Sequence, residues 1–147
     1  MRAGFGNHDA VAIAREYFKR LDAGDGAILD LFTEDVEIYF PKYGIGKGHA
    51  AFSEIATQLG RVVASTKHPV SDYLYIGSGN YLAVEGTTSG VLKNGQRWAA
   101  GETPAGRFCN IFEFRKGLIS RLHVYLDPDY AGKDEDRFLW GHEGRRW

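Results

Sequence analysis

Residues 106–127 constrain the fold of this chain more than any other stretch of its sequence. Apolar and polar residues alternate on both sides of a polar turn at residues 115–117, and most of them are β-branched or aromatic. This pattern predicts a long antiparallel hairpin. A three-residue turn would place Asn110 opposite Leu122.

One face of this hairpin is apolar except for a single amide. It holds Phe108, Asn110, Phe112, Phe114, Leu122, Val124 and Leu126. The other face holds Arg107, Cys109, Ile111, Glu113, Arg121, His123, Tyr125 and Asp127. A buried amide without a partner costs about 1 to 3 kcal/mol, so Asn110 needs one. The sequence leaves open whether that partner is Tyr17, water or a ligand.

Length, charge and cysteine content limit the classes of function. A chain of 147 residues is expected to form one domain, with a core at residues 8–127 and a C-terminal tail at 128–147. The net charge of -1 argues against a nucleic-acid partner. The only cysteine, Cys109, excludes an internal disulfide and a thiolate metal cluster. No run is long and apolar enough for a membrane span, so we expect no membrane partner and a cytoplasmic protein.

The remaining patterns predict helices followed mainly by strands. Expected helices cover residues 9–23, a short stretch from Asp25, and 49–63; expected strands cover 36–41, 65–76, 81–92 and part of 97–106. Three glycines at residues 42–48 indicate a surface loop that could act as a lid. Consecutive strands close in sequence favour antiparallel pairing. The expected fold is therefore α+β, a curved antiparallel sheet forming a cone with three helices over its concave face.

Three segments resemble a known superfamily, namely EYFKRLDAGDGAILDLFTEDVEIYFP, GIGKGHAAFSEI and CNIFEFRKGLISRLHVYLD. They resemble the cystatin-like α+β cone proteins, the SnoaL-like and nuclear-transport-factor-like group, which is related to ketosteroid isomerase and polyketide cyclases. The resemblance covers nearly all of residues 8–127. It implies the cone fold and a small-molecule pocket. It does not imply one reaction, because members range from several enzyme classes to transport factors.

The resemblance also implies roles for individual residues. Tyr17 stands where ketosteroid isomerase has its oxyanion-hole tyrosine, and Asn110 stands where it has a protonated aspartate; both groups donate to one enolate oxygen. Phe40 stands where that enzyme has its general base, so isomerase activity of that particular kind is not expected. Asp127 is similar to the acid near the last strand of SnoaL-like cyclases, and His68 is the other candidate base.

Each of these candidate residues also has an ordinary structural interpretation. Tyr17 is compatible with a tyrosine at the edge of the core, and His68 with a structural histidine. Asp127 can cap the turn that begins before Pro128. The expected ligand-binding wall of the pocket consists of Phe40, Val84, Trp98, Phe108, Phe112, Leu122 and Val124.

Two functions remain open at this point. The first is a cofactor-independent isomerase, cyclase or dehydratase acting on a small, largely apolar carbonyl compound. The second is a non-catalytic module that binds a hydrophobic ligand or dimerises. No ligand spacing for a metal is present, and no cofactor is expected. The resemblance implies a homodimer that forms through the outer face of the sheet.

Overall fold

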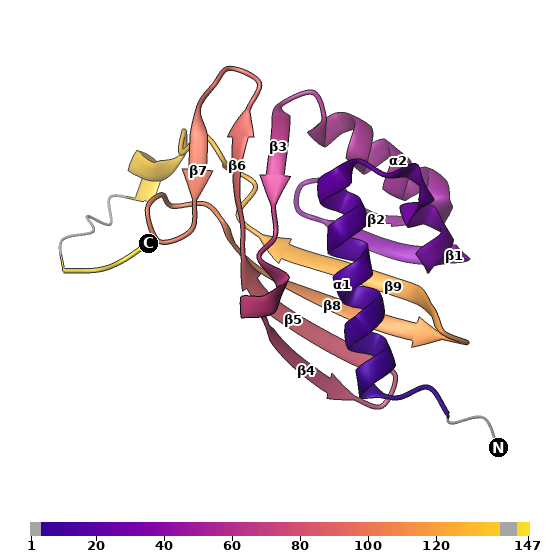
Figure 1. The fold of residues 1–147 in the computed structure, drawn as a ribbon. Coiled ribbons are helices and arrows are strands. Elements are labelled where there is room, and N and C mark those ends of the chain that lie inside the picture. Colours follow the sequence, from indigo (N-terminus) through magenta and orange to yellow (C-terminus); the bar gives the residue numbers. More distant parts are fainter. Residues whose placement is uncertain (1–3, 139–143) are drawn as a thin grey trace.

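Helix α1 (Asn7–Ala23) crosses the concave face of a curved, open sheet in the computed structural model, which describes residues 4–138 and 144–147 (Figure 1). Its buried residues recur at helical spacing: Ala10, Ala14, Tyr17 and Phe18. The helix ends at Gly24, whose φ of 63° lies in the left-handed region that glycine adopts without strain. The backbone N–H of Gly24 donates to the carbonyl of Leu21 (3.1 Å).

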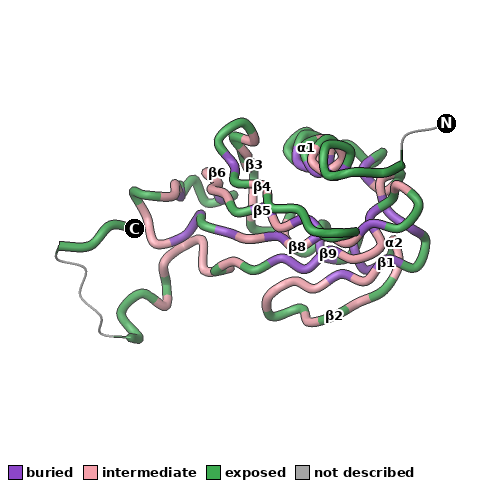
Figure 2. Tube along the Cα trace, turned by 90° about the horizontal axis from the view of Figure 1, so that it is seen from below, coloured by how far each residue is buried: buried purple, intermediate pink, exposed green. Residues whose placement is uncertain are grey.

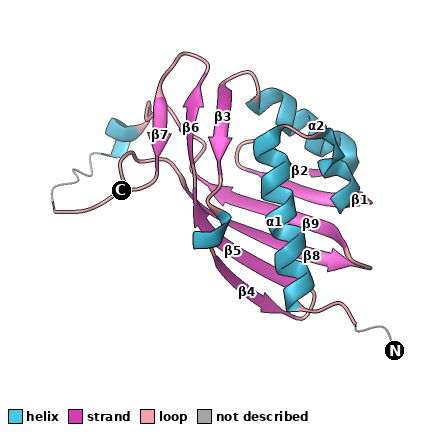
Figure 3. Ribbon diagram, viewed as in Figure 1, coloured by secondary structure: helices cyan, strands magenta, loops and turns pink. Residues whose placement is uncertain are grey.

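Two further helices lie on the same side of the sheet (Figure 3). The 3₁₀ helix η1 (Gly26–Leu31) begins where the Asp25 carboxylate accepts a hydrogen bond from the Ala27 N–H (2.9 Å). Helix α2 (Gly48–Leu59) buries Ala51, Phe52 and Ile55. The expected α+β architecture, with three helices over a curved sheet, is confirmed.

The main sheet has six strands in the order β2, β1, β9, β8, β5, β4. Their bounds are β1 (Phe32–Phe40), β2 (Gly44–Lys47), β4 (Leu74–Ser78), β5 (Tyr81–Thr87), β8 (Arg107–Arg115) and β9 (Leu118–Leu126). The sheet is mixed and not purely antiparallel, because β1 runs parallel to β9. The expectation of antiparallel pairing was wrong for this pair, since it assumed that strands pair only with their neighbours in sequence.

Two expected elements differ in the structure. The segment expected to be a free loop contains β2, which pairs with β1 through Tyr39 and Ile45 and so is not a lid. The strand expected at 81–92 divides at Thr88 into β5 and β6 (Ser89–Leu92). Strand β6 joins β3 (Val63–Lys67) and β7 (Arg97–Ala99) in a second, three-stranded sheet. Short 3₁₀ helices complete the fold, η2 (Val70–Asp72) and η3 (Glu135–Phe138).

The central hairpin is formed by β8 and β9, but its register differs from the expected one. Its turn has two residues with positive φ, Lys116 (52°) and Gly117 (77°), and a bulge follows beside Ser120. Asn110 consequently pairs with Val124 and not with Leu122. The shift is an even number of residues, so each side chain keeps its expected face.

The main core lies between α1 and the concave face of the sheet (Figure 2). Aromatic rings pack against one another there, with an edge contact between Tyr17 and Phe112 (centroids 5.5 Å apart) and a tilted contact between Phe18 and Phe108 (5.6 Å). A second, smaller cluster of Leu92, Trp98 and Ala105 lies beside the three-stranded sheet.

Candidate functional site

A cavity of about 670 Å³ lies between the helices and the concave face of the sheet. It extends along the C-terminal half of α1, η1, α2 and β3 and over parts of β1, β8 and β9. Aromatic side chains form much of its wall: Tyr17, Phe18, Phe40, Phe52, Phe108 and Tyr130. A largely apolar space of this size suits a small organic ligand.

Asn110 brings an amide into this apolar wall from the middle of β8. Asn110 is only 3% exposed, and Val84 and Val124 flank it on the neighbouring strands. Its Oδ1 is buried and has no hydrogen-bond partner among the described residues. An amide oxygen only accepts hydrogen bonds, so a bound ligand with a hydroxyl or another donor would satisfy it and remove the cost of the unpartnered atom.

Tyr17 lines the same cavity from α1. The rings of Phe18, Phe32, Phe52 and Phe112 surround its phenol. Burial, and to a smaller extent the charge of Asp22 and the neighbouring Tyr130, raise the pKa of the Tyr17 hydroxyl well above its usual range. The hydroxyl therefore stays protonated at neutral pH and is available as a hydrogen-bond donor.

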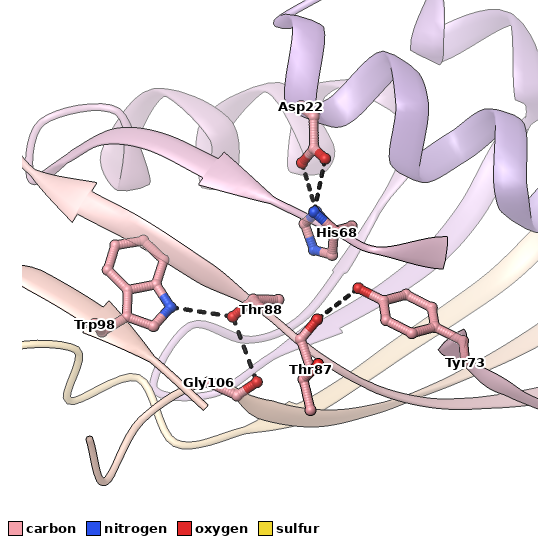
Figure 4. Close-up of polar contacts among 7 residues, drawn as sticks. All are labelled: Asp22, His68, Tyr73, Thr87, Thr88, Trp98 and Gly106. Carbon is pink, nitrogen blue, oxygen red and sulfur yellow. Dashed lines mark hydrogen bonds and ion pairs between the residues drawn. The ribbon is translucent and has the colours of Figure 1, made fainter. Parts of the chain in front are cut away.

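His68 also lines the cavity, and Asp22 holds it in place (Figure 4). The Asp22 Oδ1 lies 2.5 Å from the His68 Nδ1, and the Asp22 Oδ2 accepts a hydrogen bond from the His68 backbone N–H (2.8 Å). Asp22 belongs to the last turn of α1, and His68 follows β3. The imidazole also contacts the ring of Phe18, with centroids 4.9 Å apart. These contacts fix the orientation of the imidazole.

The contact with Asp22 also determines which nitrogen of His68 is available. An ionised carboxylate only accepts hydrogen bonds, so Nδ1 carries the proton that faces Asp22. In the neutral imidazole, Nε2 is then a free base. No hydrogen bond to Nε2 occurs within the described part of the chain. This arrangement suits general-base chemistry, because the carboxylate orients the imidazole and leaves Nε2 free to accept a proton.

Asp22 and His68 also border the outside of the molecule. Both side chains line an open groove of about 940 Å³ along the outer side of α1, together with His8, Arg15 and Lys19. The pair therefore stands between the inner cavity and a surface that bulk water reaches.

The structure places four other predicted residues away from the cavity lining. Phe40 and Phe108 line the cavity as expected, whereas Val84, Phe112, Leu122 and Val124 are packed in the core and are not part of its lining. The core residues occupy the same concave face, but α1 covers that part of the sheet. Alternation along a strand predicts which face of the sheet a residue occupies. It does not predict whether that residue packs under α1 or lines the open cavity.

Asp127 and Trp98 also lie outside the cavity lining. Asp127 is exposed, and its Oδ1 accepts a hydrogen bond from the Asp129 N–H (2.9 Å), which is the turn-capping arrangement. Trp98 belongs to the second core, where its Nε1–H donates to the Thr88 hydroxyl (3.1 Å). Of the predicted catalytic set, the structure brings together Tyr17, Asn110 and His68 around one space.

Sequence reasoning missed Asp22 and Tyr130 as candidate site residues. Asp22 follows the buried Phe18 by four residues on α1, so helical periodicity places it on the cavity side. That signal was present in the sequence. Tyr130 lies in the tail, where no periodic pattern indicates which residues return to the domain.

The described residues form neither a metal-ligand cluster nor a membrane-spanning helix. Within residues 4–138 and 144–147, no three His, Cys, Asp or Glu side chains gather closely enough to hold a metal ion. None of the helices in these ranges is long and apolar enough to cross a bilayer.

An α+β fold in which helices cover a curved sheet, with a few polar groups in an apolar cavity, defines a class of cone-shaped domains with a pocket for small molecules. The chain belongs to the SnoaL-like domain family, whose model matches residues 14–122. No curated protein sequence matches the chain.

Solved structures share this fold at low sequence identity. A proposed polyketide cyclase from Xanthomonas campestris pv. campestris has 21% identity and a TM-score of 0.71, with 83% of this chain and 93% of that chain covered. An NTF2-like protein of unknown function from Burkholderia pseudomallei has 18% identity and a TM-score of 0.71, with 89% and 97% covered. TerC, co-crystallised with polyporic acid, has 18% identity and a TM-score of 0.67, with 81% and 92% covered. These similarities establish the fold.

Proposed function

We propose that the protein is a cofactor-independent enzyme that moves a proton on a small, largely apolar carbonyl compound. The observation that carries this proposal is the His68–Asp22 pair in the same cavity as Tyr17 and Asn110. A base, two hydrogen-bond donors and an apolar wall are the parts that enolisation needs. The proposed polyketide cyclase among the structural neighbours supports this reaction class by analogy.

The proposed first step is abstraction of a proton from the carbon next to the carbonyl. The His68 Nε2 takes the proton and becomes an imidazolium, the C–H electron pair forms a C=C bond, and the C=O π pair moves onto the oxygen to give an enolate. The Tyr17 hydroxyl and the Asn110 amide N–H groups donate to the enolate oxygen. Return of the proton to a different carbon completes an isomerisation. Attack of the enolate carbon on a second carbonyl completes a cyclisation.

The role of Asp22 in this scheme is to position His68. Phe40, which occupies the base position implied by the resemblance, provides only apolar surface in the cavity. The base would therefore come from the opposite side of the cavity, from the end of α1 and the start of the loop after β3. Asp127 has no part in the proposal, because its carboxylate caps an exposed turn.

The test is hydrogen–deuterium exchange on an enolisable ketone. Exchange of the acidic C–H protons of 2-tetralone is followed by NMR in D₂O, because exchange reports proton abstraction even when the net reaction is unknown. We expect exchange above the buffer rate, reduced about 100-fold or more by His68→Gln and about 10-fold or more by Tyr17→Phe. His8→Gln, which alters only the outer groove, is the matched control and should leave the rate unchanged.

A non-catalytic role in binding a hydrophobic ligand is the second candidate, and the apolar Phe40 favours it. If 2-tetralone shifts the thermal unfolding of the protein but exchanges at the buffer rate, binding without catalysis is the correct function. Exchange that survives His68→Gln would exclude His68 as the base.

The proposed macromolecular partner is a second copy of the chain on the convex face of the sheet. Strand alternation places several exposed apolar residues on that face: Ile45, Leu74, Ile76, Tyr81 and Tyr125. Acidic and basic side chains, including Glu37 and Arg121, lie on the same face. A face that carries both charge signs and apolar area can complement itself across a two-fold axis.

Sedimentation equilibrium tests this partner. The wild-type chain should sediment as a dimer, and Ile76→Lys should sediment as a monomer, because a lysine there would be desolvated in the interface. Val62→Lys is the matched control, since Val62 (53% exposed) is about as exposed as Ile76 (57%) but is not part of the main sheet. A monomeric wild type would refute the proposal.

A further inference from the structure

The segment that follows β9 folds back onto the domain beyond the part that matches the family. The family match ends at residue 122, whereas side-chain contacts continue past it. The Asp129 carboxylate accepts hydrogen bonds from the Lys133 N–H (3.0 Å) and the Asp134 N–H (2.8 Å). The Gln96 side-chain amide donates to the Ala131 carbonyl (2.9 Å). The two Asp129 hydrogen bonds fix the conformation of residues 129–134, and the Gln96 hydrogen bond holds this segment against the turn between β6 and β7.

Tyr130 lies within this anchored segment and reaches the cavity. Its ring packs at a tilt of 43° against Trp98 with centroids 4.6 Å apart, and its side chain forms part of the cavity wall. Trp98 is itself fixed by its hydrogen bond to the Thr88 hydroxyl, which in turn donates to the Gly106 carbonyl (3.5 Å; Figure 4). Two independent constraints, one on the segment and one on the ring, therefore set the position of the Tyr130 phenol.

The Tyr130 hydroxyl has the properties of a ligand-binding donor. No hydrogen bond to it occurs within the described residues. Burial, followed by the charge of Asp127, raises its pKa to about 12, so it remains protonated at neutral pH. Tyr130 also contributes to the raised pKa of Tyr17. Tyr17 and Tyr130 both line the same cavity, so the two phenols belong to one candidate ligand site.

We infer that Tyr130 is a ligand-contacting residue, and that the cavity takes flat apolar ligands with two oxygen functions, one near Tyr17 and Asn110 and one near Tyr130. This inference rests on the proposed function only in taking the cavity as the ligand site. It assigns part of the binding site to a segment outside the family match. The ring of Tyr130, which packs at a tilt against Trp98, forms part of the cavity wall against which the second oxygen would lie.

The test compares ligands that have one and two oxygen functions on the same ring system. The probes are 2-naphthol and the 1,5-, 2,6- and 2,7-dihydroxynaphthalenes, which direct the second hydroxyl differently; their intrinsic fluorescence reports binding. We expect at least one diol to bind about fivefold or more tightly than 2-naphthol, as one additional hydrogen bond predicts. Tyr130→Phe should abolish this preference while leaving the affinity for 2-naphthol within about twofold.

The variants separate this inference from the proposed function. Tyr130→Phe keeps the aromatic contact with Trp98, so the fold should persist, and Tyr43→Phe, at an exposed tyrosine outside the cavity lining, is the matched control. A preference for the diols that survives Tyr130→Phe, or no preference in the wild type, would overturn the inference. If either of these results is found but Tyr17→Phe loses 2-naphthol binding, the inference about Tyr130 fails and the cavity remains the proposed ligand site. If the wild type binds none of the four probes, both fall.

Discussion

The buried amide of Asn110 is the residue that the fold accounts for least well. A carbonyl oxygen without a partner destabilises a protein by about 1 to 3 kcal/mol, and the residues beside it on neighbouring strands, Val84 and Val124, are apolar. An aliphatic side chain of similar volume would satisfy the packing without that penalty. The amide is therefore better explained by a ligand than by stability.

This explanation predicts opposite effects of Asn110→Leu on stability and on binding. Leucine removes the unpartnered oxygen, so we expect the free energy of unfolding to rise by about 1 kcal/mol, measured by urea denaturation. The affinity for 2-naphthol should fall, because one donor in the cavity is lost. Tyr17→Phe provides the comparison for loss of a donor from the opposite wall. A variant that is destabilised by more than about 1 kcal/mol would show that the amide is structural.

At the scale of elements, the fold depends on the junction between the two sheets. The chain passes from β5 to β6 at Thr88, whose N–H donates to the Gly106 carbonyl (2.6 Å) and whose carbonyl accepts from the Ala100 N–H (3.2 Å). Gly106 has a φ of 115°, and a Cβ there would lie 2.7 Å from both the Thr88 oxygen and the Ala100 nitrogen. The crossing therefore requires glycine for both conformation and space.

Gly106→Ala should be much more destabilising than an alanine at another glycine with positive φ. We expect a loss of more than about 2 kcal/mol, because backbone atoms would have to move apart at the junction. Gly117→Ala is the matched control: its φ is 77° and nothing lies within 4 Å, so strain alone should cost about 1 kcal/mol. Urea denaturation of both variants measures the difference. Equal losses would mean that the close approach at Gly106 relaxes freely.

At the scale of the whole molecule, a polar cluster on the convex face connects the parallel strands β1 and β9. The buried imidazole of His123 lies between Glu37 and Arg121, with Nε2 2.9 Å from the Glu37 carboxylate and Nδ1 3.0 Å from the Arg121 guanidinium. A guanidinium only donates, so Nδ1 accepts and Nε2–H donates to Glu37. That hydrogen bond is the main cause of a pKa of Glu37 below its usual range.

The depressed pKa of Glu37 predicts a loss of stability in acid. A carboxyl whose pKa is lower in the folded state stabilises the fold above its unfolded value of about 4.5, and this contribution is lost as the pH falls through the folded value. Glu37→Gln should therefore be less stable than the wild type at neutral pH and equal to it in strong acid. Urea midpoints across this pH range provide the measurement. Glu102→Gln, at an exposed turn, should show no such convergence.

Local sequence patterns determined which face each strand presents, because side-chain direction depends only on the backbone conformation of the strand itself. Asn110 kept its predicted face even though a two-residue turn and a bulge changed its partner from Leu122 to Val124. The helices, the hairpin and the α+β class were predictable for the same reason. Tyr17, Asn110 and His68 all line one cavity, and their catalytic roles stay predictions.

Only the tertiary structure decided which distant residues meet. Asp22 and His68 are separated by 46 positions, and β1 pairs with β9 although most of the chain lies between them. Such contacts depend on how the sheet curves and where α1 crosses it, which no local period encodes. The same holds for Tyr130, whose place in the cavity depends on a segment folding back onto Trp98. The sequence alone determined the faces, and long-range packing determined the site.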